Sequence, residues 1–569
     1  MNTASSRKRI LVLGGYGSFG ARLSRLLTKH TTHLVVVAGR NLSAAQKHCD
    51  EFGGVPAELN RLAITDCDLQ KIGVDILVDA TGPFSMDEAD PYRVVSACLK
   101  ANTHYTDLSD DGDFTCRITQ FHRAAVSREL LVTSGASTVP SISAAIAKSL
   151  TEDIARVEYI ETSILPGNRA PRGLSLMKSI LHQTGRPIKI WRDGVETSVP
   201  GWSSHRRKRV DVKGTIKLRP RWSALIGAPD VELFPNLFGA ENVCLRAGLE
   251  LNIMQFGLMA LSIFPRLHLV RTLRPLALPL RFLANLLEPF GSDAGGMLVE
   301  VGGRQMDGTL VEKVWALHAA SGEGPFIPAL SAFILCNKIA NGTNEIGALP
   351  CIGLLSEREI ADGLTLIDAS TQVHCAKKRS LFETTLGEQW TELPIPLRNT
   401  HAVLRRRAFR GTARVLRGTS SMATLLCFLL RFPPTSEKTP VEVIFEKRKK
   451  AEIWHRNFGG HSFRSTLTCQ DEAKGEIIER FGLFFFTVLL QVVDGELHFT
   501  VTKGRALWIP LPSFLLPKSD AKESIDADGH FKFQIELSIP WIGRIIMYEG
   551  RLEPAMQNAT LSTKLPDPS

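Results

Sequence analysis

Apolar residues form short runs over the first 150 residues, and in the segments between the runs they recur every three or four positions. Short uninterrupted runs are typical of strands buried on both faces, and the wider spacing is typical of amphipathic helices. The expected strands lie at residues 10–13, 34–38, 62–64, 76–80, 104–108 and 130–133. Strands that alternate with helices predict a doubly wound parallel sheet over residues 1–150.

The pattern changes over residues 151–355, where an α+β domain is expected. Residues 156–164 and 188–191 have the composition of strands, and 174–183 has helical spacing. Because this region follows the parallel sheet in the chain, it is the expected substrate domain.

Residues 249–287 are unusually apolar and are interrupted by Arg266, His268, Arg271 and Arg274. Two interpretations stay open. The stretch forms two buried helices that line a substrate pocket, or it forms a paired anchor at a membrane surface, because apolar faces flanked by arginines suit a headgroup layer. Both interpretations favour a hydrophobic partner.

The last third of the chain has the pattern of antiparallel strands. Residues 356–394 are mixed polar and are expected to link domains, and a mainly β domain is expected over 395–569. Asp494-Gly495 between two apolar runs is a hairpin signal, and residues 531–539 alternate strictly between apolar and polar. These features predict an antiparallel barrel or sandwich.

Composition narrows the class of protein. A chain of 569 residues, of which 44% are hydrophobic, is too long for one hydrophobic core and is expected to form several domains. Its net charge of +10 does not require nucleic acid as a partner. The ten cysteines form no CxxC pair, which favours reduced thiols in the cytoplasm. The first residues, MNTASSRKR, lead directly into a strand and leave no room for the apolar region of a signal peptide, so a cytoplasmic protein is expected.

The histidines at 401, 455 and 461 do not have the spacing of metal ligands, and no metal is expected. Charge runs at 203–209 and 405–417 are expected to face solvent, the second with an anion site as the alternative.

The turn after the first strand carries the clearest chemistry. Its glycines fit GxGxxG, in which one glycine makes the tight turn, one lets a pyrophosphate approach the backbone, and one lets helix and strand pack closely. The phosphates would rest on unpaired N–H groups at the start of the helix. We therefore expect a Rossmann-type dinucleotide site, and its residues are Gly14, Gly15, Gly17, Ser18, Phe19 and Gly20.

Three further positions concern the cofactor. Arg40 ends the second strand, where a planar cation suits the 2′-phosphate of NADP, so NADP is expected and NAD is the alternative. Asp66 follows the third expected strand, where an acidic side chain can meet the adenine. The loop after the strand at 76–80 is expected beside the nicotinamide and consists of Thr81, Gly82, Pro83 and Phe84.

These segments together resemble a known family. The glycine turn, TGPF at 81–84, HYTDLSDD at 104–111 and SGASTVPSISA at 134–144 are similar to the NADP-binding domain of saccharopine dehydrogenase-like oxidoreductases. EIWHRNFGG at 452–460, ERFG at 479–482, WIPLPS at 508–513 and YEGRL at 548–552 resemble a domain of unknown function fused to bacterial proteins of that group.

The resemblance implies an NADP-dependent oxidoreductase that transfers hydride to or from a small molecule, and the apolar middle region predicts a hydrophobic or acyl-like one. In related reductases the chain returns to the nucleotide-binding half after an inserted domain, and the helix expected near 325–341 is the candidate for that return. No tyrosine is followed by a lysine four residues later, so the proton donor of short-chain dehydrogenases is missing. The candidate proton partners are Tyr105 and Asp107, and the candidates for binding an anionic substrate group are Arg169 and Arg172.

A non-catalytic alternative also fits the sequence. The same nucleotide fold without a recognisable acid–base set suits a protein that senses NADP or binds lipid. Peripheral contact with the inner face of a membrane through residues 249–287, and a homodimer, are compatible with both hypotheses.

Overall fold

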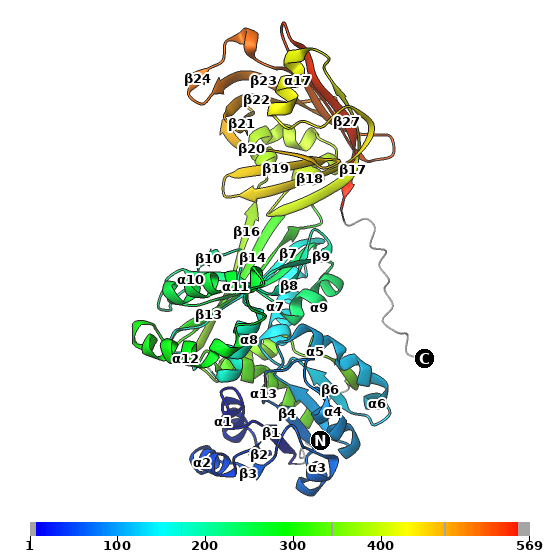
Figure 1. The fold of residues 1–569 in the computed structure, drawn as a ribbon. Helices are drawn as coiled ribbons and strands as arrows, with labels where there is room; N and C mark the ends of the chain where they lie inside the picture. Colours follow the sequence, from blue (N-terminus) through cyan, green and yellow to red (C-terminus); the bar gives the residue numbers. More distant parts are fainter. Residues whose placement is uncertain (1–6, 172, 343–344, 472–473, 556–569) are drawn as a thin grey trace.

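The computed structural model describes residues 7–171, 173–342, 345–471 and 474–555. Figure 1 shows three units one above another: a parallel sheet with its helices at the bottom, a mixed sheet in the middle and a barrel at the top. None of the helices in these residues is both long and apolar enough to cross a bilayer.

The N-terminal unit is the doubly wound parallel sheet that the sequence predicts. Its seven strands lie in the order β15-β6-β5-β4-β1-β2-β3, and every neighbouring pair is parallel. Apolar side chains of the central strands are fully buried on both faces, as their uninterrupted runs require. The strands are β1 Arg9–Leu13, β2 Leu34–Gly39, β3 Val55–Glu58, β4 Ile76–Asp79, β5 His104–Asp107, β6 Leu131–Ser134 and β15 Gly347–Pro350.

The third strand lies elsewhere than expected. Residues 62–64 form a turn before helix α3 (Asp66–Ile72), and the strand is β3, which pairs with β2 directly after Gly53 and Gly54 end helix α2 (Leu42–Phe52). The edge strand β3 is half-exposed, so it has no apolar run by which the pattern could identify it. The prediction at 62–64 is therefore wrong.

The chain returns to this unit after the middle domain. Helix α13 (Phe326–Ala340) packs against helix α1 (Gly20–His30), and β15 then pairs with β6 at the edge of the parallel sheet. The nucleotide-binding sheet thus takes an edge strand from beyond residue 346, and the middle domain is inserted between β6 and β15.

The middle domain is a mixed sheet. Its main path is β10-β11-β12-β7-β13-β14-β16, and the β8–β9 hairpin joins it through β12. Residues 356–394, expected as a linker, instead contain β16, which pairs with β14 along ten residues, so that expectation is corrected. The strands are β7 Arg156–Leu165, β8 Pro187–Arg192, β9 Val195–Pro200, β10 Arg206–Lys208, β11 Arg221–Ile226, β12 Asn242–Gly248, β13 Gly295–Arg304, β14 Leu310–Ala319 and β16 Ala369–Lys378.

The apolar stretch at 249–287 forms short helices on the side of this sheet. Helices α10 (Asn252–Leu261), α11 (Ile263–Arg266) and α12 (Ala277–Leu286) leave most of their large apolar side chains exposed. The expectation that two buried helices line a pocket here is therefore wrong. The inner sides of α10 and α12 pack on helix α8 (Leu174–Gln183).

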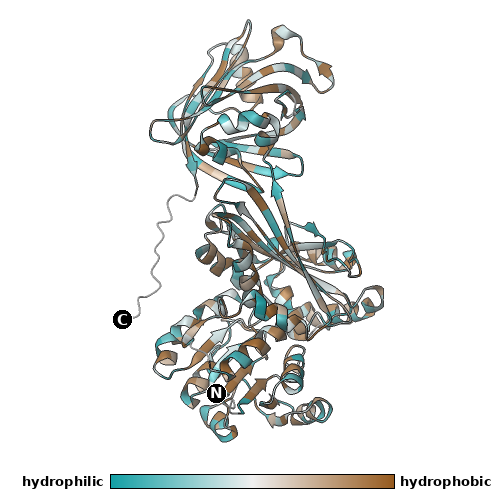
Figure 2. Cartoon of the chain, turned by 180° about the vertical axis from the view of Figure 1, so that it is seen from behind, coloured by the Kyte–Doolittle hydropathy of each residue, from teal (hydrophilic) through white to brown (hydrophobic). Residues whose placement is uncertain are grey.

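The C-terminal unit is a closed antiparallel barrel, one of the two architectures that the sequence predicts. Ten strands form the ring, because β22 pairs with both β21 and β23. Their residues alternate between buried and more exposed, and the colours in Figure 2 alternate along the barrel strands accordingly. The ring strands are β17 Arg406–Arg417, β18 Ser436–Arg448, β19 Ala451–Phe458, β20 His461–Asp471, β21 Glu476–Phe481, β22 Phe484–Val493, β23 Glu496–Ala506, β25 Lys518–Ile525, β26 Phe531–Ile539 and β27 Gly543–Pro554.

A cluster of buried ions lies where the middle sheet meets the barrel. The guanidinium of Arg405 lies 3.6 Å from the ring centroid of Tyr159 and 3.4 Å from the Glu161 carboxylate. Burial would raise the pKa of Glu161, but Lys208, Arg246 and Arg405 hold it well below its usual range. The two charge runs expected to face solvent thus contribute Lys208 and Arg405 to an internal cluster, which corrects that expectation for these two residues.

Replacing Arg405 with alanine should destabilise the protein strongly. The change removes positive charge that neutralises buried carboxylates. The free energy of unfolding is therefore expected to fall by about 3 kcal/mol. Urea denaturation followed by circular dichroism measures it. The matched control is Arg414→Ala on β17, whose partner Glu437 is 76% exposed, and a change of at most about 1 kcal/mol is expected there. Equal effects of both substitutions would contradict the account.

Candidate functional site

The loops after β1 and β4 meet at the carboxyl edge of the parallel sheet. The strand order reverses at this point, which is where doubly wound sheets bind their ligands. Gly14 has a φ of +79°, and the amides of Gly14 and Gly15 donate to the Ala38 carbonyl at 2.7 and 3.1 Å. A Cβ at Gly14 would lie 2.9 Å from the Thr81 methyl carbon, so the glycine turn and the TGPF loop are in contact.

Helix α1 begins in this turn without a side-chain cap. Phe19 occupies the N-cap position and makes no capping hydrogen bond, and the first turn contains no acidic residue. Among the described residues, no acceptor receives a hydrogen bond from the backbone amides of Ser18, Phe19 or Gly20. A Cβ at Gly20 would collide with the Gly14 carbonyl, so only glycine allows the helix to start so close to β1. The arrangement leaves donors free for an anion.

The end of β2 presents a cation and an aromatic ring. Arg40 is exposed, and no carboxylate of the described residues pairs with it. The Tyr16 ring lies over Gly39, and its hydroxyl accepts a hydrogen bond from the Asn41 amide at 2.9 Å. Asp66 lies half-buried in the first turn of α3.

The loop after β4 is held by a buried carboxylate. Asp79 accepts hydrogen bonds from the Thr81 amide at 2.9 Å and from the Thr81 hydroxyl at 2.5 Å. Arg61 lies 3.1 Å from Asp79 and 2.9 Å from Glu88, and its guanidinium stacks over the Phe84 ring at 5.2 Å. Phe84 is buried, Thr81 and Gly82 are half-buried, and Pro83 is exposed.

Arg61 was not identified from the sequence. It lies in a polar turn, and its partners Asp79 and Glu88 are 18 and 27 residues away, so no local spacing identifies it. Its charge is used inside the protein, which makes it a positioning residue for the TGPF loop.

Tyr105 and Asp107 are both buried and bonded to each other. The Tyr105 hydroxyl donates to Asp107 at 3.0 Å, and Asp107 also accepts from the Ser109 amide, the Ser134 hydroxyl and the Gly135 amide at 2.8–2.9 Å. Burial raises the pKa of Asp107 to about 6 and raises the pKa of Tyr105 well above its ordinary value. Asp107 thus ties the ends of β5 and β6 together, and a catalytic role for either residue stays a prediction.

The remaining predicted residues are less informative. Arg169 is exposed in the loop after β7, and Arg172 lies outside the described residues.

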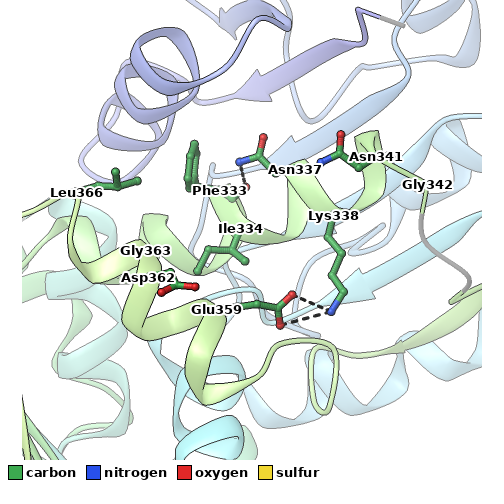
Figure 3. A pocket seen from close by; sticks show the side chains of 10 residues that line it. All are labelled: Phe333, Ile334, Asn337, Lys338, Asn341, Gly342, Glu359, Asp362, Gly363 and Leu366. Atoms are coloured by element: carbon green, nitrogen blue, oxygen red, sulfur yellow. Dashed lines mark hydrogen bonds and ion pairs between the residues drawn. The ribbon is translucent and has the colours of Figure 1, made fainter. Parts of the chain in front are cut away.

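A hollow of about 500 Å³ is lined by α13 and α14 (Glu357–Leu364), and the Lys338–Glu359 ion pair of 3.1 Å lies on its wall (Figure 3). It contains no residue of the glycine turn, so we do not assign the cofactor to it. Asp526, Asp528 and His530 also place ligand atoms within 4.8 Å of one another, but Asp526 already pairs with Arg551 at 2.9 Å.

Comparisons with known proteins agree with this geometry. Residues 10–136 match the family model of the saccharopine dehydrogenase NADP binding domain, so this part of the chain has the NADP-binding fold of dehydrogenases and reductases. Residues 393–552 match a domain of unknown function, DUF4166, which covers the barrel. The resemblance inferred from the sequence is confirmed for both segments. No curated protein matches the chain.

Solved structures resemble the chain only distantly. Saccharopine dehydrogenase (L-Glu forming) from Saccharomyces cerevisiae is 15% identical, with 65% of this chain and 100% of that chain covered and a TM-score of 0.47. Biliverdin reductase from Synechocystis sp. PCC 6803, solved with biliverdin and NADP+, is 11% identical, with 63% and 96% covered and a TM-score of 0.29.

The raised pKa of Asp107 makes stability depend on pH. The buried carboxyl binds its proton more tightly in the folded state, so its ionisation costs stability as pH rises from about 4 to about 6. The Asp107→Asn variant keeps the shape and lacks this titration. The free energy of unfolding of the wild type, relative to the variant, should therefore fall by about 3 kcal/mol over that interval.

Urea denaturation of both proteins at a series of pH values measures the difference. A difference between wild type and Asp107→Asn that rises with pH would have the wrong sign and would refute the assignment.

Proposed function

We propose that the protein is an NADP-dependent oxidoreductase that transfers hydride to or from a hydrophobic or acyl-like small molecule. The observation that carries the proposal is the uncapped start of α1 within a turn where Gly14 has a positive φ and Gly20 has no room for a side chain. Free amides beside a helix N-terminus fit a pyrophosphate. The match of residues 10–136 to an NADP-binding family supports the same assignment.

NADP is the proposed cofactor, with NAD as the alternative. Gly14, Gly15, Gly17, Ser18, Phe19 and Gly20 would hold the pyrophosphate. Arg40, whose charge is not neutralised by a described carboxylate, would bind the 2′-phosphate, and Asp66 would lie toward the adenine. The loop Thr81–Phe84, held by Asp79 and Arg61, would form the nicotinamide side.

The cofactor supplies the hydride chemistry when it is bound. The chain would position the cofactor through the glycine turn and shape the nicotinamide side through Asp79 and Asp107, which fix the loops after β4 and β5. Tyr105 and Asp107 are our candidates for the proton partner, and the Ser134 hydroxyl, which donates to Asp107 at 2.9 Å, is a neighbouring side chain that could pass a proton on. Arg169 and Arg172 are proposed to hold an anionic group of the substrate.

The proposal of an apolar substrate rests on helix α8. This helix begins beside the glycine turn, since a Cβ at Gly173 would lie 2.8 Å from the Ser18 hydroxyl oxygen. It packs on α12, whose outer side is apolar and exposed. An apolar molecule bound along these helices would thus reach the carboxyl edge of the parallel sheet.

Two substitutions separate the parts of the nucleotide site. A Cβ at exposed Gly17 approaches the Gly14 carbonyl at 3.1 Å, so Gly17→Ala should fold but weaken NADPH and NADH binding alike, by about tenfold or more. Arg40→Ala removes only the proposed phosphate contact and should weaken NADPH binding about tenfold without changing NADH. Titration of nucleotide fluorescence measures both dissociation constants.

The matched controls are Gly324→Ala, where a Cβ meets nothing within 4 Å, and Arg123→Ala, an exposed arginine on the far helix α6 (His122–Val126). Neither should change binding. If Arg40→Ala weakens the binding of NADPH and NADH equally, the assignment of NADP is wrong. If Gly17→Ala leaves the binding of both nucleotides unchanged, the glycine turn is not the binding site.

A non-catalytic protein that senses NADP or binds lipid is the second candidate, favoured by the burial of Tyr105 and Asp107. The two functions differ in turnover. The oxidoreductase should consume NADPH with an apolar ketone, imine or enoyl compound, and Gly17→Ala should lose that activity. Tight NADPH binding with no turnover across such a panel would favour the sensor.

A further inference from the structure

The helices between Asn252 and Phe290 form an exposed apolar face on the middle domain. Thirteen large apolar side chains of this segment are exposed. We call this surface the apolar helical face, and its most exposed members, each at least 63% accessible, are Ile253, Leu267, Leu269, Leu278, Phe282 and Phe290. Large apolar side chains exposed in such number on one segment, rather than singly, mark a contact with a partner or a membrane.

Packing within the protein uses only the inner side of these helices. Leu273 and Ala277 are buried against Leu181 of α8, with Leu258 and Leu261 partly buried beside them. Phe256 of α10 also contacts the sheet, because its ring centroid lies 5.7 Å from that of Trp222 on β11. By contrast, Ile253 of α10 is 70% exposed and Phe282 of α12 is 66% exposed. The outer side of these helices is therefore open to the surroundings.

The charge of this segment is mainly positive. Between Asn252 and Phe290 there are four arginines and one carboxylate, that of the exposed Glu288 near the end of the segment. Arg266 and Arg271 are exposed, Arg274 and Arg281 are half-buried, and no described carboxylate forms an ion pair with any of the four. Glu250, just before the segment, is paired with Arg221 at 3.0 Å. The apolar face thus carries unneutralised positive charge.

We propose that the apolar helical face binds the surface of an anionic lipid bilayer. Exposed Leu, Ile and Phe side chains would enter the boundary between headgroups and acyl chains, and the arginines would contact lipid phosphates. Helices α10 and α12 have ten residues each, about 15 Å, which is half the thickness of the hydrocarbon core. They are accordingly suited to lie along the surface.

A second copy of the chain fits this face less well. A two-fold contact places the same patch on both sides, so the four arginines of one copy would face the same four of the other, with only Glu288 of each copy to offset them. An anionic lipid surface supplies the complementary charge and accepts the apolar side chains at once. The inference does not depend on the redox assignment.

Vesicle flotation tests the proposal with the full chain. The protein should float with vesicles that contain about one third phosphatidylglycerol in phosphatidylcholine, and it should remain at the bottom with phosphatidylcholine alone. Raising the salt concentration should weaken the binding, because it screens the arginine contacts.

Two variants separate the apolar and the charged contributions. Leu278→Ser with Phe282→Ser should reduce partitioning about tenfold or more, and Arg266→Gln with Arg271→Gln should reduce it at least about fivefold and abolish most of its salt dependence. Because all four side chains are exposed, the folded structure should persist, which circular dichroism checks. The matched control is Ile216→Ser with Met306→Ser, two exposed apolar residues outside the face, and it should float as the wild type does.

Three results would overturn the proposal: no flotation with anionic vesicles, equal loss in the control variant, or a wild-type dimer that Leu278→Ser with Phe282→Ser converts to a monomer in light scattering. NADPH binding is measured on the same preparations. Loss of flotation with intact NADPH binding, or the reverse, shows which of the two proposals has failed.

Discussion

The close approach of helix α1 to strand β1 is the constraint on which the nucleotide-binding half depends. Gly20 lies against the Gly14 carbonyl, and any side chain at that position would separate helix from sheet. Phe19, at the N-cap of α1, has no side-chain atom that can accept a hydrogen bond, so the first amides of the helix find no acceptor among the described residues. The turn that packs helix against strand is therefore also the turn whose donors are open to an anion.

Buried carboxylates arrange the rest of the carboxyl edge around that turn. Asp79 orders the loop after β4 through Thr81 and Arg61, and Asp107 orders the loops after β5 and β6. Both are fully buried, so each depends on its hydrogen bonds to offset the cost of burial. Their role explains why acidic residues occur at the ends of these two strands.

Local patterns predicted the parts of the fold that have local causes. The central strands are uninterrupted apolar runs, and the glycine turn is a short-range motif. Strand β3 was missed because an edge strand needs no apolar run. Strand β17 was interpreted as a basic surface because arginines alternate with its buried Phe409 and Val415. Arg61 depends on partners distant in the chain, and whether the helices at 252–290 are covered cannot be derived from their apolar spacing, since buried and lipid-facing helices share it.

The position of β15 has a consequence for how the protein is made. This strand completes the parallel sheet beside β6, but roughly two hundred residues separate the two in the chain. On the ribosome, β6 therefore emerges long before its neighbour and presents unpaired backbone groups throughout synthesis of the inserted domain. Nascent chains of this architecture could pair with one another through this open edge. We expect a chaperone that shields the edge, or rapid folding of the inserted domain, to prevent such pairing.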